Sequence, residues 1–225
     1  MATGFRQRLF RACAALSALL ASMCACGEGD TGGWRPEKSE DGIHVYSRAV
    51  EGSSVRAVKA EVAVDAAFED AVALLLDASQ RPRWDELCAE ASIVRRVSET
   101  EDVAYIHNDL PWPVSDRDMV LRRIWSVDAD RSRAQIRASV MDGVLPEIAG
   151  RVRVTHADGV WTIERGDAAG VHITTEIHAD PGGPVPDWLM NALSVQGPYK
   201  ALRNIRHLLE SREGDPGPEL RRAAP

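Results

Sequence analysis

The sequence predicts an α+β domain in which one long antiparallel sheet is followed by one long helix. From residue 43 to residue 179, short segments of alternating apolar and polar side chains follow one another, separated by turns rich in Gly, Asp and Ser. After Pro186 the apolar spacing changes from two residues to 3.6, which is typical of an amphipathic helix. The length of 225 residues suits a single domain. Several folds of this class remain open at this point.

The N-terminal part of the domain is predicted to hold two strands and two helices. The strands span Ile43–Tyr46 and Val55–Val64, and the alternation in the second predicts a sheet with one dry face. A helix follows with Asp65 as its N-cap, and Arg81-Pro82 ends it. Residues 83–91 are predicted to form a second short helix over the sheet.

Further strands and a long final helix complete the prediction. The strands are expected at 92–98, 103–110, 118–127, 134–140, 151–156, 160–165 and 171–179, with turns at 99–102, 128–130, 157–159 and 166–170. The helix extends to about Ser211. Gly197-Pro198 predicts a kink near 195–198, because proline removes a backbone hydrogen bond. The apolar face of this final helix carries Leu189, Leu193, Gln196, Tyr199, Leu202, Ile205 and Leu209.

Residues 1–26 have the pattern of a secretory leader: a basic start, a short apolar run and then small residues. Met23-Cys24-Ala25-Cys26 resembles a bacterial lipobox, which predicts lipidation of Cys26, with Cys24 as the weaker candidate. An ordinary cleaved leader and an uncleaved anchor are the alternatives. Residues 27–33 then form a flexible linker, 34–212 the domain and 213–225 a frayed tail. The expected location is the periplasm or the outer membrane.

Charge and residue usage exclude several classes of function. The net charge is −7, and removal of a leader with three arginines and no acid brings it to −10, which argues against a nucleic-acid partner. Cys88 is the domain's one cysteine, so no internal disulfide is expected and a buried, unreactive thiol is favoured. The six histidines lack metal-ligand spacing, and no nucleophile or nucleotide motif occurs. No cofactor and no metal are predicted.

Two stretches carry a family resemblance. The first is Leu110-Pro-Trp-Pro-Val-Ser-Asp-Arg-Asp-Met-Val-Leu-Arg-Arg123, and the second is Asp180-Pro-Gly-Gly-Pro-Val-Pro-Asp-Trp-Leu-Met-Asn191. They resemble the "P..RDFV" and "DPGG.LP.WL.N" signatures of the START (StAR-related lipid-transfer) family. The resemblance covers roughly Trp34 to Arg212. It implies a helix-grip fold, in which a curved sheet surrounds the last helix and one lipid or sterol is bound in an apolar cavity.

The alternation of the strand after the first motif makes Arg123 the most informative charge. Arg123 falls on one face with Met119, Leu121 and Trp125, where an unpaired guanidinium would be costly. The resemblance implies that it pairs with an acid on the neighbouring strand and meets the ligand hydroxyl through water. The candidate partners are Asp109, Asn108 and His107. A bulge that directs Arg123 to solvent is the alternative.

Further ligand contacts and a gate follow from the same resemblance. Leu193 and Tyr199 would contact the ligand from the last helix. The gate would consist of Leu110, Pro111, Trp112 and Pro113 together with Gly197 and Pro198. Trp112 either meets a membrane or caps the core. Arg117 is expected to attach the proline loop to the sheet through a carboxylate.

Three functions are compatible with the sequence. The first is a carrier of one apolar ligand taken from a membrane surface, with a sterol or terpenoid favoured and a phospholipid or fatty acid next. The second is a helix-grip cyclase or hydrolase in which Arg123 and His107 provide the best catalytic pair. The third is an envelope sensor that binds a ligand to signal to a partner. The oligomeric state is not determined by the sequence.

Overall fold

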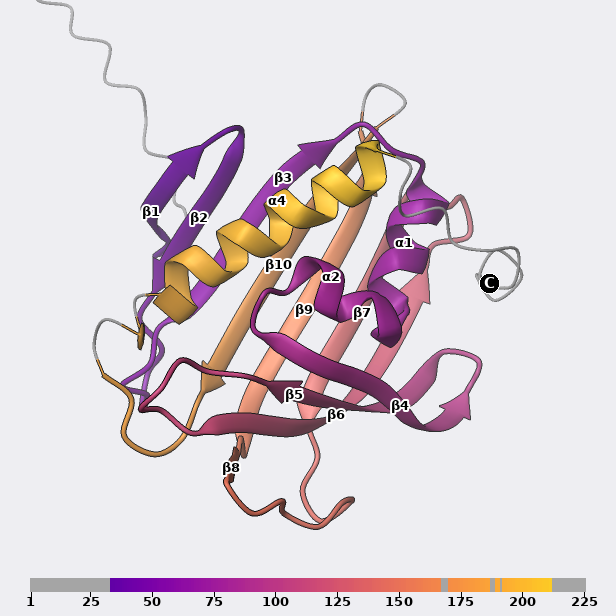
Figure 1. The fold of residues 1–225 in the computed structure, drawn as a ribbon. Coiled ribbons are helices and arrows are strands. Elements are labelled where there is room, and N and C mark those ends of the chain that lie inside the picture. Colours follow the sequence, from indigo (N-terminus) through magenta and orange to yellow (C-terminus); the bar gives the residue numbers. More distant parts are fainter. Residues whose placement is uncertain (1–32, 167–169, 187–188, 191, 212–225) are drawn as a thin grey trace, which may run out of the picture. The chain divides into compact units, whose positions relative to one another are not determined.

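The strands form one long sheet in the computed structural model, which describes residues 33–166, 170–186, 189–190 and 192–211 (Figure 1). The described strands are β1 (Arg35–Glu40), β2 (Ile43–Arg48), β3 (Ala57–Val64), β4 (Cys88–Ser98), β5 (Glu101–Asn108), β6 (Asp116–Val127), β7 (Arg133–Val140), β8 (Arg151–Arg153), β9 (His156–Arg165) and β10 (Val171–Asp180). Their order is β1-β2-β3-β10-β9-β7-β6-β5-β4, with all pairs along this path antiparallel. The short strand β8 lies off this path and pairs in parallel with the start of β6.

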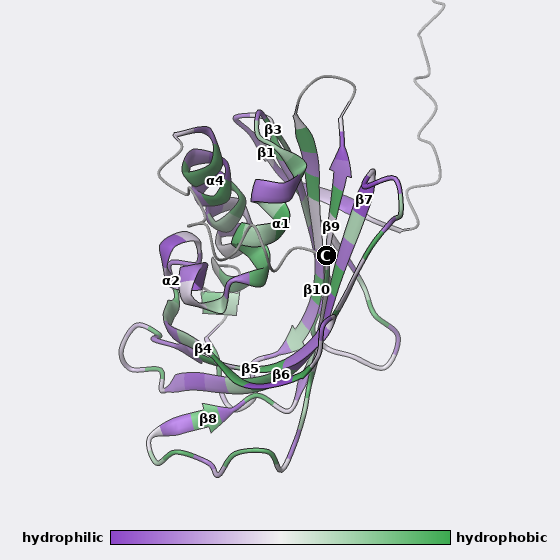
Figure 2. Ribbon diagram, turned by 90° about the vertical axis from the view of Figure 1, so that its right-hand side faces the viewer, coloured by the Kyte–Doolittle hydropathy of each residue, from purple (hydrophilic) through white to green (hydrophobic). Residues whose placement is uncertain are grey.

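The helices lie on one face of the sheet, and β4, β5 and β6 curl beneath them (Figure 2). They are α1 (Phe68–Leu76), the 3₁₀ turn η1 (Ala78–Gln80), α2 (Arg81–Trp84), the π-helical turn η2 (Ala192–Gln196) and α4 (Gly197–Glu210). Helix α4 packs against β2 and β3, and α1 packs against β9. This arrangement confirms the expected helix-grip fold.

The sheet has an inner face toward the helices and an outer face away from them. Apolar side chains at alternate positions build the inner face, and the main core joins it to α1 and α4 through Ile163, Ile173, Leu202 and Ile205. A second cluster on the outer face contains Val103, Tyr105 and Val120 and is covered by residues of the segment between β7 and β8. Both faces of β5 and β6 are therefore dry near the first motif.

Several predicted boundaries are wrong in the first third of the domain. Helix α1 has Ala67 as its N-cap with no side-chain hydrogen bond, so Asp65 does not cap it. The second helix ends at Trp84, because residues 88–91 pair with β5 as the start of β4. Strand β1 was not predicted: its burial is low, so its sequence carries no alternating apolar signal.

Two predicted turns lie within strands. Residues 157–159 belong to β9 and pair with both neighbours, and β8 adds to β6 in place of forming a hairpin. Residues 101–102 begin β5, so the β4–β5 turn is shorter than expected. Polar residues suggest a turn locally, but pairing with a neighbouring strand overrides that preference.

The last helix is irregular where the sequence predicted a kink. Residues 192–196 form a π turn, and α4 continues from Gly197 with proline near its N-terminus. Proline cannot donate a backbone hydrogen bond, so the regular ladder is interrupted there. The predicted leader with Cys24 and Cys26, most of the linker and the tail lie outside the described residues.

Candidate functional site

Arg117 joins the two signature motifs. Its side chain is 3% exposed and donates hydrogen bonds only to backbone carbonyls: Nη1 to Ser115, Nε to Pro181 at 3.3 Å and Nη2 to Gly182 at 2.9 Å. The expected carboxylate partner is wrong, since no ion pair of Arg117 occurs among the described residues. Burial lowers the pKa of Arg117. The guanidinium thus holds the proline loop (residues 109–115) against the segment after β10 (residues 181–186).

The second motif provides these acceptors through its glycines. Gly182 and Gly183 have φ angles of 67° and 63°, a left-handed conformation that favours glycine. The backbone N–H of Gly182 donates to Asp180 Oδ1 at 2.9 Å, which stabilises the turn. In this turn the carbonyls of Pro181 and Gly182 accept from Arg117. The motif is therefore explained by backbone geometry.

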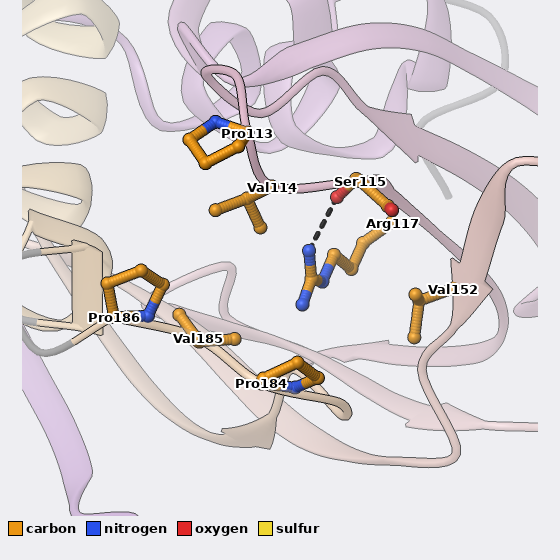
Figure 3. A pocket seen from close by; sticks show the side chains of 8 residues that line it. All are labelled: Pro113, Val114, Ser115, Arg117, Val152, Pro184, Val185 and Pro186. Carbon is orange, nitrogen blue, oxygen red and sulfur yellow. Dashed lines mark hydrogen bonds between the residues drawn. The ribbon is translucent and has the colours of Figure 1, made fainter.

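A cavity of about 450 Å³ lies between the two loops (Figure 3). Arg117 extends into it, with Val152 at one side. The remaining lining residues come from the two loops: Pro113, Val114, Ser115, Pro184, Val185 and Pro186.

Arg123 lies on the inner face as expected, but its partner is Asp102. Nε and Nη2 of Arg123 each donate to one oxygen of Asp102 at 2.8 Å, and Nη2 also donates to the Leu76 carbonyl at 3.0 Å. Arg123 is 8% exposed and Asp102 is 0% exposed. The two residues are directly opposite each other in the β5–β6 register. The exposed Arg96 also reaches Asp102, at 3.3 Å.

The three expected partners of Arg123 are wrong because the strand register places them elsewhere. Asn108 is opposite Arg117, at the other end of the hairpin, and Asp109 is exposed beyond β5. His107 is on the outer face, where its Nε2 contacts Asp116 Oδ2 at 2.8 Å. Because His107 and Arg123 are on opposite faces, they do not form the acid–base pair that an enzyme in the inner space would need.

Asp116 and Asp118 flank Arg117 and serve the outer face. Asp116 accepts from His107 and from the backbone N–H of Leu110, and its pKa is lowered, chiefly by the hydrogen bond from His107. Asp118 is 1% exposed and accepts two hydrogen bonds from Arg153, at 2.8 and 3.0 Å. Burial alone would raise the pKa of Asp118, but the bonds from Arg153 bring it below its ordinary value. These pairs hold the proline loop and the β7–β8 segment to β6.

The expected apolar ligand contacts are on the inner face of β6. Leu121 and the partly buried Met119 belong to a cluster with Cys88 and Ile106, and Trp125 belongs to the main core. Inner-face residues toward the proline-loop end of the neighbouring strands are only partly buried: Ala138, Val140, Gly159 and Ile177. Apolar surface of β7, β9 and β10 therefore remains partly accessible on the inner face.

Four buried polar atoms have no hydrogen-bond partner among the described residues: Trp84 Nε1, Asn108 Oδ1, Trp125 Nε1 and Thr175 Oγ1. Thr175, Trp161, Ile136 and Trp125 form one row across β10, β9, β7 and β6, since each is opposite the next. Trp84 from α2 packs edge-on against Trp161, with ring centroids 5.6 Å apart. Unpaired buried polar groups are unusual in native structures. Here Thr175 and Trp125 lie at the two ends of the row, and Trp84 contacts Trp161 within it.

The proposed gate residues differ in exposure. Leu110 is 6% exposed and anchors the loop, while Pro111 and Pro113 are exposed. Trp112 is 92% exposed and does not cap the core. Gly197 and Pro198 follow the π turn.

Two expected ligand residues lie on the last helix. Leu193 is partly buried within η2. Tyr199 is a core residue whose hydroxyl donates to Asp41 Oδ2 at 3.1 Å, so its polar end is directed to the β1–β2 turn. Cys88 is buried, and burial raises the pKa of its thiol to about 11.

The described part of the chain has neither a metal-binding cluster nor a membrane-spanning helix. No group of three or more His, Cys, Asp or Glu side chains there is arranged to hold a metal ion. No helix among these residues has the length and apolar character needed to cross a membrane.

The model of the START domain matches residues 18–213. The chain belongs to the START domain family. An uncharacterised protein of Pseudomonas aeruginosa is 31% identical to it over 181 residues, which cover 80% of this chain and 88% of that protein. Bovine (Bos taurus) phosphatidylcholine transfer protein is 25% identical over 176 residues, covering 76% of this chain and 82% of that protein.

Solved structures agree with this assignment of the START domain. The crystal structure of a STAR-related lipid transfer protein from Xanthomonas axonopodis has a TM-score of 0.72 and 37% identity, covering 79% of this chain and 99% of that one. Human STARD10 has the same TM-score at 22% identity, covering 84% of this chain and 78% of that one, and supports the fold alone.

Proposed function

We propose that this START domain is a carrier that holds one lipid molecule against the inner face of its sheet and moves it between membranes. The observation that carries the proposal is the set of unpaired polar atoms of Thr175 and Trp125 on that face and of Trp84 on the helix opposite it. A buried donor or acceptor without a partner costs about 1–3 kcal/mol, so a ligand that brings a matching polar group recovers part of that energy. The names of the relatives as lipid-transfer proteins support the same class of ligand.

Within that class we favour a sterol or another terpenoid over a phospholipid. Asp102 neutralises Arg123, so this pair suits a ligand whose polar end is uncharged rather than a phosphate. Thr175 on β10 and Trp125 on β6 have two strands between them, so they provide two separate uncharged hydrogen-bonding positions for a ligand. A carrier is favoured over an enzyme because the best acid–base pair from the sequence is divided between two faces of the sheet.

A lipid anchor at Cys26 would place this carrier at a membrane of the bacterial envelope. The exposed indole of Trp112 and the neighbouring prolines would then contact the donor membrane, where an amphipathic ring is favourable. The proline loop and the start of α4 would act as the gate. Location and gating are parts of the proposal.

The test is sterol binding by a Thr175→Val variant, measured by fluorescence titration with a fluorescent sterol. Valine keeps the shape and removes the unpaired hydroxyl, so the empty protein is expected to be more stable. One neutral hydrogen bond contributes about 0.5–1.5 kcal/mol, so the sterol should bind roughly 2- to 13-fold more weakly.

Ile173→Val is the matched control, because Ile173 lies on the same face two residues away and carries no polar group. A parallel titration with phosphatidylcholine decides between ligand classes. If the wild-type protein extracts neither lipid from vesicles, the carrier function is wrong. Tight phosphatidylcholine binding with no sterol binding would support the carrier function and contradict the preference for a sterol.

A further inference from the structure

The cavity between the proline loop and the 181–186 segment has a buried positive charge that forms no direct ion pair with a described residue. Arg117 is almost fully buried at its wall, and its three recorded hydrogen bonds all go to uncharged carbonyls. Arg123 and Arg153, the other buried arginines near it in sequence and fold, each have a carboxylate with two hydrogen bonds. Arg117 is thus a buried cation that no carboxylate of the described residues contacts directly.

A buried guanidinium keeps its charge, since it does not deprotonate in proteins. Backbone carbonyls accept hydrogen bonds from its N–H groups, but they are uncharged, so the net charge of the guanidinium is not balanced by them. Asp116 precedes Arg117 in the chain and attracts it electrostatically, but both of its oxygens accept hydrogen bonds from His107 and Leu110 on the outer face. An anion in the cavity would balance this charge and would lose only its own hydration, because the cation is already removed from water.

The remaining walls of the cavity are apolar. Val114, Val152 and Val185 face it together with three prolines, and Figure 3 shows Arg117 between the two loops. Its volume of about 450 Å³ lies within the range of small-molecule sites. A small hydrated anion would leave these walls in contact with water, whereas an attached hydrocarbon chain would cover them.

We propose that this cavity is a second binding site, for an amphiphile with an anionic carboxylate or phosphate head on an acyl chain. The head is bound by Arg117, whose planar donors match both oxyanions in bidentate geometry. The acyl chain of the amphiphile contacts the valines and prolines of the cavity wall. The site differs from the inner-face site in its residues and in the charge of its ligand, so it goes beyond the proposed function.

Occupancy of the site has a consequence for the gate. Arg117 holds both loops through carbonyls of Ser115, Pro181 and Gly182. An anionic head that takes Arg117 N–H groups competes with these carbonyls and weakens the link between the loops. An anionic lipid would therefore loosen the mouth of the domain.

The experiment is calorimetric titration of the full chain with four probes. Oleate and oleoyl lysophosphatidic acid carry the two anionic heads, oleyl alcohol carries the chain alone, and inorganic phosphate carries the anion alone. Hydrogen bonds to a charged group predict that oleate binds about 10- to 150-fold more tightly than oleyl alcohol. Inorganic phosphate alone should bind more weakly than lysophosphatidic acid. Equal affinities for oleate and oleyl alcohol would overturn the proposal.

Variants at the cavity wall locate the site. Arg117→Gln removes the cation and should abolish the preference for oleate over oleyl alcohol, but it also leaves three carbonyls unpaired. Val185→Glu keeps Arg117 while placing a carboxylate in the cavity, so it should weaken oleate binding by the same 10- to 150-fold range. Val185→Gln is its neutral control. The proposal fails if Val185→Glu and Val185→Gln bind oleate equally.

Two further measurements separate the alternatives. Sterol binding should be unchanged in Val185→Glu, and loss of both ligands would mean that they share one site. Asp187, which follows Pro186, lies outside the described residues. If oleate binds only after Asp187→Asn, the chain supplies its own counter-ion and the anion site is rejected.

Discussion

Replacement of Arg123 by methionine tests whether the Asp102–Arg123 pair stabilises the link between β5, β6 and the end of α1. The variant leaves Asp102 with no exposure and without its bidentate partner, and it removes the hydrogen bond to the Leu76 carbonyl. Removal of one partner from a buried ion pair costs about 3–5 kcal/mol. Arg96 remains 3.3 Å from Asp102, so the loss should be near the lower value.

A loss of about 3 kcal/mol corresponds to a fall in Tm of roughly 6–12 °C for a domain of this size. Replacement of both partners, as in Asp102→Leu with Arg123→Met, removes the uncompensated charge and should recover most of the stability. Urea unfolding of the wild type, both single variants and the double variant gives the coupling energy directly.

The control is Arg96→Gln, which removes an exposed cation and should change stability by less than about 1 kcal/mol. If Arg123→Met and the double variant lose the same stability, the pair is not coupled and the argument from burial is wrong. The double variant also separates a structural role of Arg123 from a role in ligand recognition. If the double variant loses more affinity for a hydroxylated sterol than for the hydrocarbon analogue of that sterol, Arg123 contacts the ligand's hydroxyl.

Three other outcomes are expected. Trp112→Ala should slow lipid extraction from vesicles without lowering Tm, because the indole is 92% exposed; equal rates would dismiss the loop as a membrane contact. Cys26→Ser should release the protein from the membrane fraction, and an effect of Cys24→Ser alone would move the lipidation site. Asp118 has a lowered pKa, so its contribution to stability is present above the unfolded value of about 3.9 and is lost as pH falls through the folded value. Urea unfolding between pH 7 and pH 2 should show a smaller acid loss for Asp118→Asn than for wild type.

Local patterns were sufficient to predict the fold class and the position of the motifs. The alternation in 118–127 placed Met119, Leu121, Arg123 and Trp125 on one face, and all four are on the inner face. Gly197-Pro198 predicted the irregularity that is seen as a π turn. These features depend on neighbouring residues in the chain, so the sequence contains their cause.

The sequence identified the residues of both motifs, but it did not predict which residues they contact. Arg117 and Asp180 were recognised within two signatures, whereas their connection through the carbonyls of Pro181 and Gly182 was not. Backbone acceptors carry no mark in a sequence, since every residue has a carbonyl. Thr175 and Trp84 were likewise missed, because a lone threonine or tryptophan has no sequence signal of an unpaired polar atom.

The partner of Arg123 required the register of the β5–β6 hairpin. Asp102 was assigned to a turn, and Asn108 and His107 were considered because the family resemblance places the acid near them. Pairing of Asp102 with Arg123 follows only when Asn108 pairs with Arg117 across the proline loop. A shift of one residue moves every side chain to the other face of a strand, so local sequence predicts which residues are polar or apolar, while contacts between distant segments decide which of them meet.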